Sequence, residues 1–316
     1  MNSLRVNFTE DKAVWDAFVL TSSQRSIFVH SKFLESLNLK YALVTCYENN
    51  KIVAGAPVQI GRVEQITDLV FPYQGVLLQK NEYKNLHSQV ENEHRILNFF
   101  IKEISDHYQC YCLSNSWRLQ DLRAFSWLNF YDKSKSRIKN ELHYTGILDL
   151  NKFDNFEHYK SSVRSVRRRE FNKASSSLEF KFTTDVSLLV SLYKKTFERQ
   201  NLEVDNKTAE LIAALSKQAL LAGYGKIAIA LIENVPISAA FFVYDDRTAY
   251  YLFAANDPEY RKFGSGTYLL MSMIRDAFEC NVSEVDFLGV NSPNRGDFKI
   301  SFNPELKPYH VCTYNE

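Results

Sequence analysis

Two glycines stand directly before a predicted helix in the second half of the chain. Gly264 and Gly266 follow the apolar run 249–255 and precede a segment with helical apolar spacing that starts at Thr267. Glycine has no Cβ, so the backbone there can turn tightly and approach a ligand closely. The first amides of a helix lack partners inside the helix, and the helix dipole adds positive potential. The pattern predicts an anion site suited to a pyrophosphate, although two such glycines can also form a simple turn.

The predicted anion site has a defined set of residues. Its backbone part comprises Gly264, Ser265, Gly266 and Thr267. Arg261 precedes them and can add a charged contact. A site of this kind would hold the phosphates of an activated donor, and no counterpart of it occurs in the first half of the chain. We therefore expect only the second half to bind a donor.

A second group of candidates lies in the basic segment 161–173. Arg164 and Arg168 are one helical turn apart, so both can face the same ligand. Guanidinium groups bind phosphates and carboxylates in a bidentate manner. This spacing would suit a sugar nucleotide, a tRNA acceptor or an acidic glycan. A solvated basic face of a helix is the equally acceptable alternative.

The elements that must position these residues follow from apolar periodicity. In the second half we expect helices at 156–174, 186–199, 207–221 and 267–280, and strands at 227–232, 237–244, 249–255 and 285–290. In the first half we expect helices at 11–20 and 92–107, a hairpin over 41–60, and strands at 108–113 and 144–150. A shift of 185 positions superimposes the hairpin turn at Glu48 on the one at Glu233, a faint sign of duplication that chance can also produce.

Composition sets the limits of the interpretation. A chain of 316 residues with 45% hydrophobic residues is long enough for two domains with buried cores, which we place at 1–150 and 151–316. The formal net charge of +1 argues against an overall attraction to nucleic acid or membrane. We expect no metal site, since the seven histidines form no ligand pattern, and no membrane span. The five cysteines and the polar start predict reduced thiols in a cytoplasmic protein without a signal peptide.

Several motifs resemble those of known acyltransferases. The segment 261–266, RKFGSG, resembles the R/Q-x-x-G-x-G/A signature of GNAT acetyltransferases. The flanking segments FAANDPEY (253–260) and EVDFLGV (284–290), the Phe298-Lys299 pair, and Arg164 and Arg167 with Ala174 are similar to motifs of FemAB-related, CelD-like acyltransferases. Weaker similarity at Trp127 and at 144–150 extends the resemblance to about two thirds of the chain. The long helical arm of the peptidoglycan-bridge enzymes has no visible counterpart.

The resemblance implies a fold, a donor and catalytic roles. The fold would be α/β with mixed sheets, in two tandem GNAT-like domains, and the donor a coenzyme A thioester held at the glycine turn. A backbone amide at Ala254 or Ala255 would stabilise the developing oxyanion, as the comparable strand does in GNAT enzymes. By the same resemblance Lys299 lies at the active site, where its charge can act on the reaction. Phe298 can wall the donor, and Asp286 is either a general base or a structural carboxylate.

The predicted function is transfer of an acyl group from an acyl-CoA to an amine or hydroxyl, and cell-envelope or polysaccharide biosynthesis is the expected setting. Asn291, Tyr73 and Gln74 are candidate acceptor-side residues, the last two with Pro72 in the first domain. The acceptor would be a small molecule, a glycan or a sugar nucleotide. Two alternatives stay open: an aminoacyl-tRNA-dependent FemAB-type transferase, and a noncatalytic binding protein with the same fold. Neither the acyl group, the acceptor nor the oligomeric state follows from the sequence.

Overall fold

The chain folds into two compact units in a computed structural model that describes residues 3–9, 11–60, 71–198 and 204–315. Unit 1 comprises residues 1–143 and 308–316, and unit 2 comprises residues 144–307. The chain passes from one unit to the other within strands β6 (Lys139–Asp149) and β12 (Glu305–Asn315). The C-terminal residues therefore belong to unit 1, whereas the sequence interpretation grouped them with the second domain.

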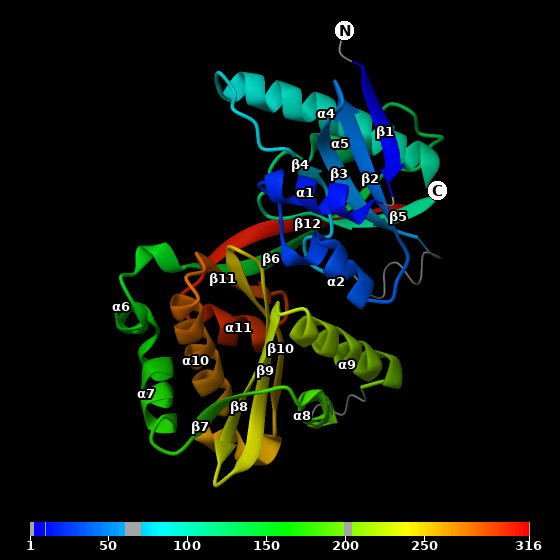
Figure 1. Cartoon of the computed structure of the whole chain (residues 1–316). Helices are drawn as coiled ribbons and strands as arrows, with labels where there is room; N and C mark the ends of the chain where they lie inside the picture. The colour runs from blue at the N-terminus through cyan, green and yellow to red at the C-terminus, as the bar shows by residue number, and fades with distance from the viewer. Residues whose placement is uncertain (1–2, 10, 61–70, 199–203, 316) are drawn as a thin grey trace. The chain divides into compact units, whose positions relative to one another are not determined.

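Unit 1 is built on a four-stranded antiparallel sheet in the order β1-β2-β3-β4 (Figure 1). Its strands are β1 (Leu4–Thr9), β2 (Tyr41–Glu48), β3 (Lys51–Gln59) and β4 (Leu77–Leu78). A further strand, β5 (Cys110–Ser114), pairs with β12 in antiparallel register. The helical elements are α1 (Lys12–Thr21), η1 (Ile27–Val29), α2 (Ser31–Ser36), α4 (Leu86–His107) and α5 (Arg123–Trp127).

Two helices of unit 1, α1 and α4, have N-cap side chains, and α4 buries an apolar stripe. Asp11 caps α1 by accepting bonds from the amides of residues 13 and 14, and Asn85 caps α4 in the same way. The apolar stripe of α4 at Ile96, Phe100 and Ile104 is buried against the sheet and β5. The expected helices at 11–20 and 92–107 are present, and α4 begins earlier because Asn85 supplies the cap.

Unit 2 contains a sheet in the order β6-β11-β10-β9-β8-β7, with helices on both of its faces (Figure 1). Its strands are β7 (Glu179–Thr183), β8 (Gly225–Ile232), β9 (Val235–Tyr244), β10 (Thr248–Asn256) and β11 (Glu284–Gly289). Its helical elements are η2 (Leu150–Lys152), α6 (Phe156–Ser162), α7 (Ser165–Ala174), α8 (Val186–Glu198), α9 (Asn206–Leu221), η3 (Pro258–Phe263), α10 (Ser265–Glu279) and α11 (Arg295–Ile300).

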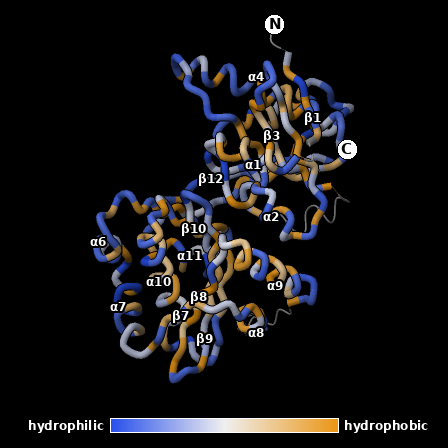
Figure 2. Tube along the Cα trace, viewed as in Figure 1, coloured by the Kyte–Doolittle hydropathy of each residue, from blue (hydrophilic) through white to orange (hydrophobic). Residues whose placement is uncertain are grey.

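The core of unit 2 lies between α10 and the strands. Most residues of α10 are buried, and they pack with α6 and α7 on one face of the sheet. Figure 2 shows hydrophobic residues along β8, β9 and α10, and hydrophilic residues along α7. Helices α8 and α9 cover the other face (Figure 1). The mixed α/β fold predicted from the sequence is confirmed.

The two hairpins aligned by the 185-residue shift share their turn geometry. Asn49 and Asn50 join β2 to β3, and Glu233 and Asn234 join β8 to β9. All four residues have positive φ, between 49° and 65°, as a two-residue type I′ hairpin turn requires. Each hairpin also has a register shift just before its turn. Under the 185-residue shift, however, residues 49–50 fall on 234–235, so the two structural turns are one position out of register with the sequence alignment.

The prediction of one continuous helix over 156–174 is wrong. The chain forms two shorter helices, α6 and α7, because Val163 and Arg164 adopt extended backbone angles between them. Val163 is buried in the core of unit 2, while Arg164 is exposed. Val163 is the C-cap of α6, and Arg164 is the N-cap of α7. Strands β1, β4, β7 and β12 and helices α2, α5 and α11 were not foreseen.

Candidate functional site

Strands β10 and β11 separate towards their carboxyl ends. Their parallel register runs from Thr248 opposite Glu284 to Tyr250 opposite Asp286. From Tyr251 to Asn256, β10 has recorded pairing with β9 only. A bulge between Tyr251 and Phe253 accompanies the separation. The predicted oxyanion residues Ala254 and Ala255 lie in this part of β10, whose edge towards β11 has no recorded strand pairing in the described structure.

The end of β11 is held in an unusual conformation by Asp286. Leu288 has a positive φ of 54°, which is rare for a bulky side chain. The Oδ1 atom of Asp286 accepts bonds from the Leu288 amide at 2.7 Å and from the Thr145 hydroxyl at 2.5 Å. Asp286 itself is 1% exposed. These contacts give the carboxylate a structural part in shaping β11, the second of the two roles predicted for it.

Lys299 reaches from α11 to the same end of β11. Its Nζ atom donates to the carbonyl oxygens of Phe287 at 2.7 Å and Gly289 at 3.1 Å, and it lies 5.6 Å from the centre of the Tyr251 ring. Burial lowers the pKa of Lys299 to about 8, against the opposing effect of the Asp286 carboxylate. An ammonium group has three protons, so this lysine can bridge the two carbonyls and still donate to a third oxygen.

The glycine turn forms the start of α10. Gly264 precedes the helix in the left-handed conformation with φ of 69°, and no side chain caps the helix there. A Cβ on Gly266 would come within 3.2 Å of the Asn256 Oδ1 atom, so glycine permits close contact between α10 and the end of β10. Asn256 Oδ1 also accepts from the Ser238 and Ser265 hydroxyls at 2.6 and 3.4 Å. The predicted strand, glycine turn and helix start are therefore contiguous.

Helix α8 secures the end of β10 from the other face. The Thr196 hydroxyl donates to the Asn256 carbonyl at 3.0 Å and accepts from the Asn256 amide at 2.8 Å. Lys195 pairs with Asp257 at 2.6 Å, and Asp257 caps η3 by accepting from the Glu259 amide. Burial would raise the pKa of Asp257, but the bond from Lys195 holds it below its usual value. The strand end that carries the predicted oxyanion amides is thus fixed on both faces.

Arg167 links three helices beside the first turn of α10. Its guanidinium donates to Glu170 at 2.6 Å and to the Ser301 hydroxyl at 2.8 Å, and it lies 4.8 Å from the centre of the Phe298 ring. Glu170 also accepts from the Thr267 hydroxyl at 2.8 Å. A carboxylate is therefore fixed next to a helix N-terminus, where the dipole stabilises negative charge.

The remaining candidates of unit 2 take separate positions. Arg261 lies exposed in η3, next to the glycine turn, and Arg164 is exposed at the start of α7. Arg168 donates to the Ser161 carbonyl at 2.8 Å, so its side chain turns back along α6. Asn291 bonds the amide and the carbonyl of Tyr144 at 2.6 and 3.0 Å, an extension of the β11–β6 pairing. Arg164 and Arg168 are joined by a backbone hydrogen bond, from the Arg168 amide to the Arg164 carbonyl at 3.2 Å, but the Arg168 guanidinium is directed to Ser161.

Tyr73 and Gln74 lie in unit 1 and are buried there. Gln74 donates to the Phe28 carbonyl at 3.1 Å and accepts from the Tyr41 hydroxyl at 3.3 Å. Tyr73 has a positive φ of 64° and packs its ring edge to face against Tyr309. The loop is thus tightly built, with a backbone conformation that costs energy and often marks a functional segment.

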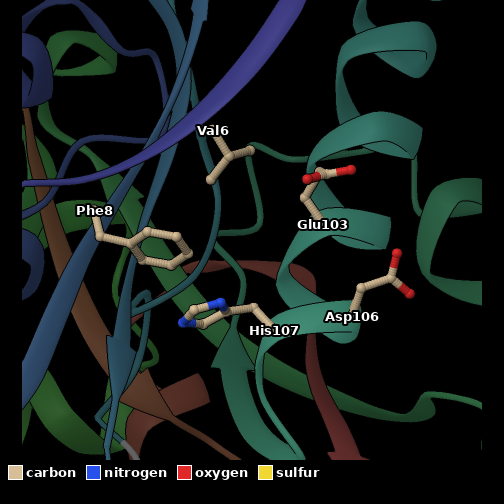
Figure 3. A pocket seen from close by; sticks show the side chains of 5 residues that line it. All are labelled: Val6, Phe8, Glu103, Asp106 and His107. Atoms are coloured by element: carbon tan, nitrogen blue, oxygen red, sulfur yellow. The ribbon is translucent and has the colours of Figure 1, made fainter.

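A shallow hollow in unit 1 involves none of the predicted residues. It lies between β1 and α4 and is lined by Val6, Phe8, Glu103, Asp106 and His107 (Figure 3). The rings of Phe8 and His107 stack at 4.2 Å, and the two carboxylates lie on α4. Its lining includes no helix start, glycine turn, lysine or arginine that would suit a donor phosphate. Among the described residues, no group of three or more His, Cys, Asp or Glu is arranged to hold a metal ion.

Sequence reasoning missed Arg167, Glu170 and Asn256 as parts of this site. Arg167 and Glu170 have i, i+3 spacing, a detectable signal for an ion pair on a helix. The contacts of Arg167 with Ser301 and Thr267 join segments far apart in the chain, so the sequence alone did not reveal them. Asn256 precedes the predicted motif but is important only because Gly266 packs against its side chain.

Comparison with known proteins defines the class of unit 2. Residues 161–299 match the family model described as an acetyltransferase (GNAT) domain. This range contains the separated strands, the glycine turn and Lys299. This part of the chain is therefore similar to GNAT domains. No curated protein matches the sequence.

Solved structures extend the similarity to the whole chain. The structure of FemX is 12% identical and has a TM-score of 0.67, covering 97% of this chain and 96% of its own. A tandem GNAT protein from the clavulanic acid biosynthesis pathway is 10% identical, with a TM-score of 0.54 over 98% of both chains. L-PGS from Bacillus licheniformis is 11% identical, with a TM-score of 0.52 over 97% of this chain and 92% of its own. The fold of the whole chain is thus similar to that of FemX and of a tandem GNAT protein, in agreement with the tandem GNAT-like fold predicted from the sequence.

Proposed function

We propose that this protein transfers an acyl group from an acyl-CoA thioester to an amine or hydroxyl acceptor. The observation that carries the proposal is the left-handed Gly264 at the uncapped start of α10, adjacent to the unpaired edge of β10 in the described structure. Helix amides and the dipole there suit the pyrophosphate of coenzyme A. The separated strands would accommodate the pantetheine arm and leave the thioester near residues 254–255.

Each proposed catalytic group has a stated task. A backbone amide at Ala254 or Ala255 stabilises the carbonyl oxygen as it gains charge. Lys299, close to the end of β11, supplies a positive charge and a third donor proton for the same developing charge. Phe298 supports the site by packing against Arg167. Asp286 holds the strand end, and the proton acceptor for the nucleophile is not assigned.

Acceptor recognition rests on a different set of residues. Arg164 is exposed next to α7 and can bind a phosphate or carboxylate of the acceptor, with Arg168 contributing after release from Ser161. An acidic glycan or a sugar nucleotide from cell-envelope or polysaccharide biosynthesis has this chemistry. Asn291 bonds to the backbone of Tyr144, so in this proposal it supports the segment that follows β11. Tyr73 and Gln74 stay candidates of unit 1 that rest on the sequence alone.

An aminoacyl-tRNA is the second candidate donor. The likeness to FemX over nearly the whole chain supports it, as does Glu170, whose carboxylate lies beside the first turn of α10 and opposes a further anion there. Against it stands the uncapped glycine turn itself, a compact site better suited to a pyrophosphate than to an extended RNA. No helix among the described residues is long and apolar enough to cross a membrane.

A thermal-shift screen tests the proposal. Acetyl-CoA and longer acyl-CoA species should raise the melting temperature in a concentration-dependent manner, because a ligand that binds only the folded state stabilises it. The same screen with deacylated and aminoacylated tRNA tests the alternative donor. Stabilisation by charged tRNA, with no response to any acyl-CoA, would replace the proposed donor. Donor binding without turnover of any amine or hydroxyl acceptor would favour a noncatalytic binding protein.

A further inference from the structure

An exposed aromatic and basic loop follows α5 in unit 1. We call residues 126–139 the aromatic–basic loop. Trp127 is 49% exposed, Phe130 51% and Tyr131 95%. Four exposed cations follow within nine residues of Phe130, namely Lys133, Lys135, Arg137 and Lys139. Large rings gain nothing for folding when they are left in water, so this arrangement requires another explanation.

The loop has a fixed shape that presents its rings. The Asn129 side chain donates to the Ser136 carbonyl at 2.8 Å, and Arg137 donates to the Ser126 carbonyl at 2.9 Å. Asn129 has a positive φ of 54°. In a further turn the Asp132 amide donates to the Asn129 carbonyl at 3.1 Å. These crosslinks fix both sides of the loop, so the exposed tip is preorganised and little ordering would be needed on binding.

Charge along the loop is predominantly positive. Asp132 accepts from the Ser134 amide and hydroxyl at 3.1 and 2.6 Å, and Glu141, just beyond the loop, pairs with Lys139 at 2.6 Å. The four cations therefore outnumber the carboxylates near them. A partner for this surface must combine negative charge with an apolar layer that accepts aromatic rings.

We propose that the aromatic–basic loop docks the protein on an anionic lipid membrane. Phe, Trp and Tyr favour the boundary between headgroups and acyl chains, and lysines near an anionic leaflet are attracted by its surface potential. Phe130 and Tyr131 would enter this boundary while Lys133 and Lys135 contact lipid phosphates. The inference does not depend on the donor or the acceptor of the proposed reaction.

The geometry of the rings disfavours RNA as the partner. Phe130 and Tyr131 are nearly perpendicular, with an interplanar angle of 80°, so they cannot form one platform for consecutive bases. The Arg137 guanidinium lies 5.0 Å from the centre of the Phe130 ring, and that of Arg123 lies 5.4 Å from the centre of the Trp127 ring. Each of these rings has one face covered. Insertion of ring edges into an interface needs no free stacking face.

Vesicle co-sedimentation of the full chain tests the proposal. Binding to phosphatidylcholine vesicles that contain phosphatidylglycerol is expected, with much weaker binding to pure phosphatidylcholine and a decline as salt increases. Lys133→Gln with Lys135→Gln should lower the partition coefficient about fivefold per lysine. Phe130→Ser with Tyr131→Ser should lower it by a similar or larger factor. These side chains are exposed, so the variants should fold, which their melting temperatures verify.

Matched controls exist in the same unit. Lys80→Gln with Lys84→Gln removes two other exposed charges, and Leu86→Ser removes an apolar side chain that is 74% exposed. Both should bind vesicles like the wild type. Quenching of tryptophan fluorescence by brominated lipids should disappear in Trp127→Phe and persist in Trp117→Phe. Absence of wild-type binding to anionic vesicles, equal losses in loop and control variants, or loop-dependent binding of an RNA oligonucleotide without vesicle binding would each overturn the proposal.

Discussion

The Nζ atom of Lys299 donates to the carbonyl oxygen of Phe287 at 2.7 Å, which joins α11 to the end of β11. A side chain from a short C-terminal helix thus places a positive charge where β10 and β11 separate. The same lysine binds the Gly289 carbonyl, so it also supports the backbone around the left-handed Leu288. Its proposed catalytic role and its structural role are distinguishable by experiment.

Removal of the ammonium group should slow the chemical step. Lys299→Ala is expected to lower kcat and kcat/KM together by about 10²-fold, a magnitude typical for loss of one electrostatic stabiliser. Donor affinity, measured by calorimetry, should change little. A variant with normal kcat and a raised KM would make Lys299 a binding residue. Circular dichroism and the melting temperature must show that the variant, which loses two bonds to β11, is still folded.

The activity should depend on pH through Lys299. Because burial lowers the pKa of this lysine to about 8, its charged form predominates below pH 8 and is lost above it. If the charge acts in the transition state, kcat/KM should fall about tenfold per pH unit above this pKa. In Lys299→Arg the guanidinium keeps its charge, so the rate, even if lower, should lack this decline. An identical decline in both proteins would assign the titration to another group.

Arg167 should be a positioning residue for α10 and α11. Arg167→Lys keeps the charge but cannot bind Glu170 and Ser301 while stacking on Phe298. We expect a loss of about 1–2 kcal/mol in the free energy of unfolding. We also expect a lower kcat/KM, with the pH dependence of kcat/KM unchanged. The neighbouring Arg169→Lys is the matched control, since Arg169 is exposed on the same helix and has no proposed part in the site. Equal effects of the two substitutions would refute the assignment.

Glu170 should limit the affinity for a phosphorylated donor. Its carboxylate accepts from the Thr267 hydroxyl at the first turn of α10, beside the proposed pyrophosphate site. Glu170→Gln removes one negative charge and retains a hydrogen-bonding oxygen, so coenzyme A should bind a few-fold more tightly at low salt, with a smaller gain at high salt. Weaker binding at every ionic strength would mean that the Arg167–Glu170 pair is required to hold the site together.

Donor binding should protect unit 2 and leave unit 1 unchanged. Hydrogen exchange in the presence of coenzyme A should slow for amides in 254–268, because these border the separated strands and the glycine turn. Amides of β2 and β3, the related hairpin of unit 1, should exchange at unchanged rates. Protection confined to unit 1 would contradict the proposed division of labour.

The sequence predicted the donor-side elements because they depend on local signals. Apolar alternation located β8 to β10, and Gly264 with Gly266 located the start of α10. The contacts that organise the site are long-range and escaped prediction. Asp286 meets Thr145 across 141 residues of the chain. Lys299 is only 12 residues from Phe287, but the bond between them depends on how α11 folds back on β11. The split of the basic helix at Val163 and Arg164 was missed because neither residue is a strong helix breaker.

Calorimetric titration of coenzyme A into the wild type, Gly264→Val and Gly223→Val tests the central claim most directly. Both glycines have positive φ, near 70°, in unit 2, so both substitutions strain the backbone, but Gly223 follows α9 and has open space around it. The account predicts micromolar-range binding by the wild type and Gly223→Val, and at least a tenfold weaker affinity, about 1.4 kcal/mol, for a folded Gly264→Val. Equal affinity of folded Gly264→Val and wild type, or no binding of coenzyme A by the wild type, would contradict it.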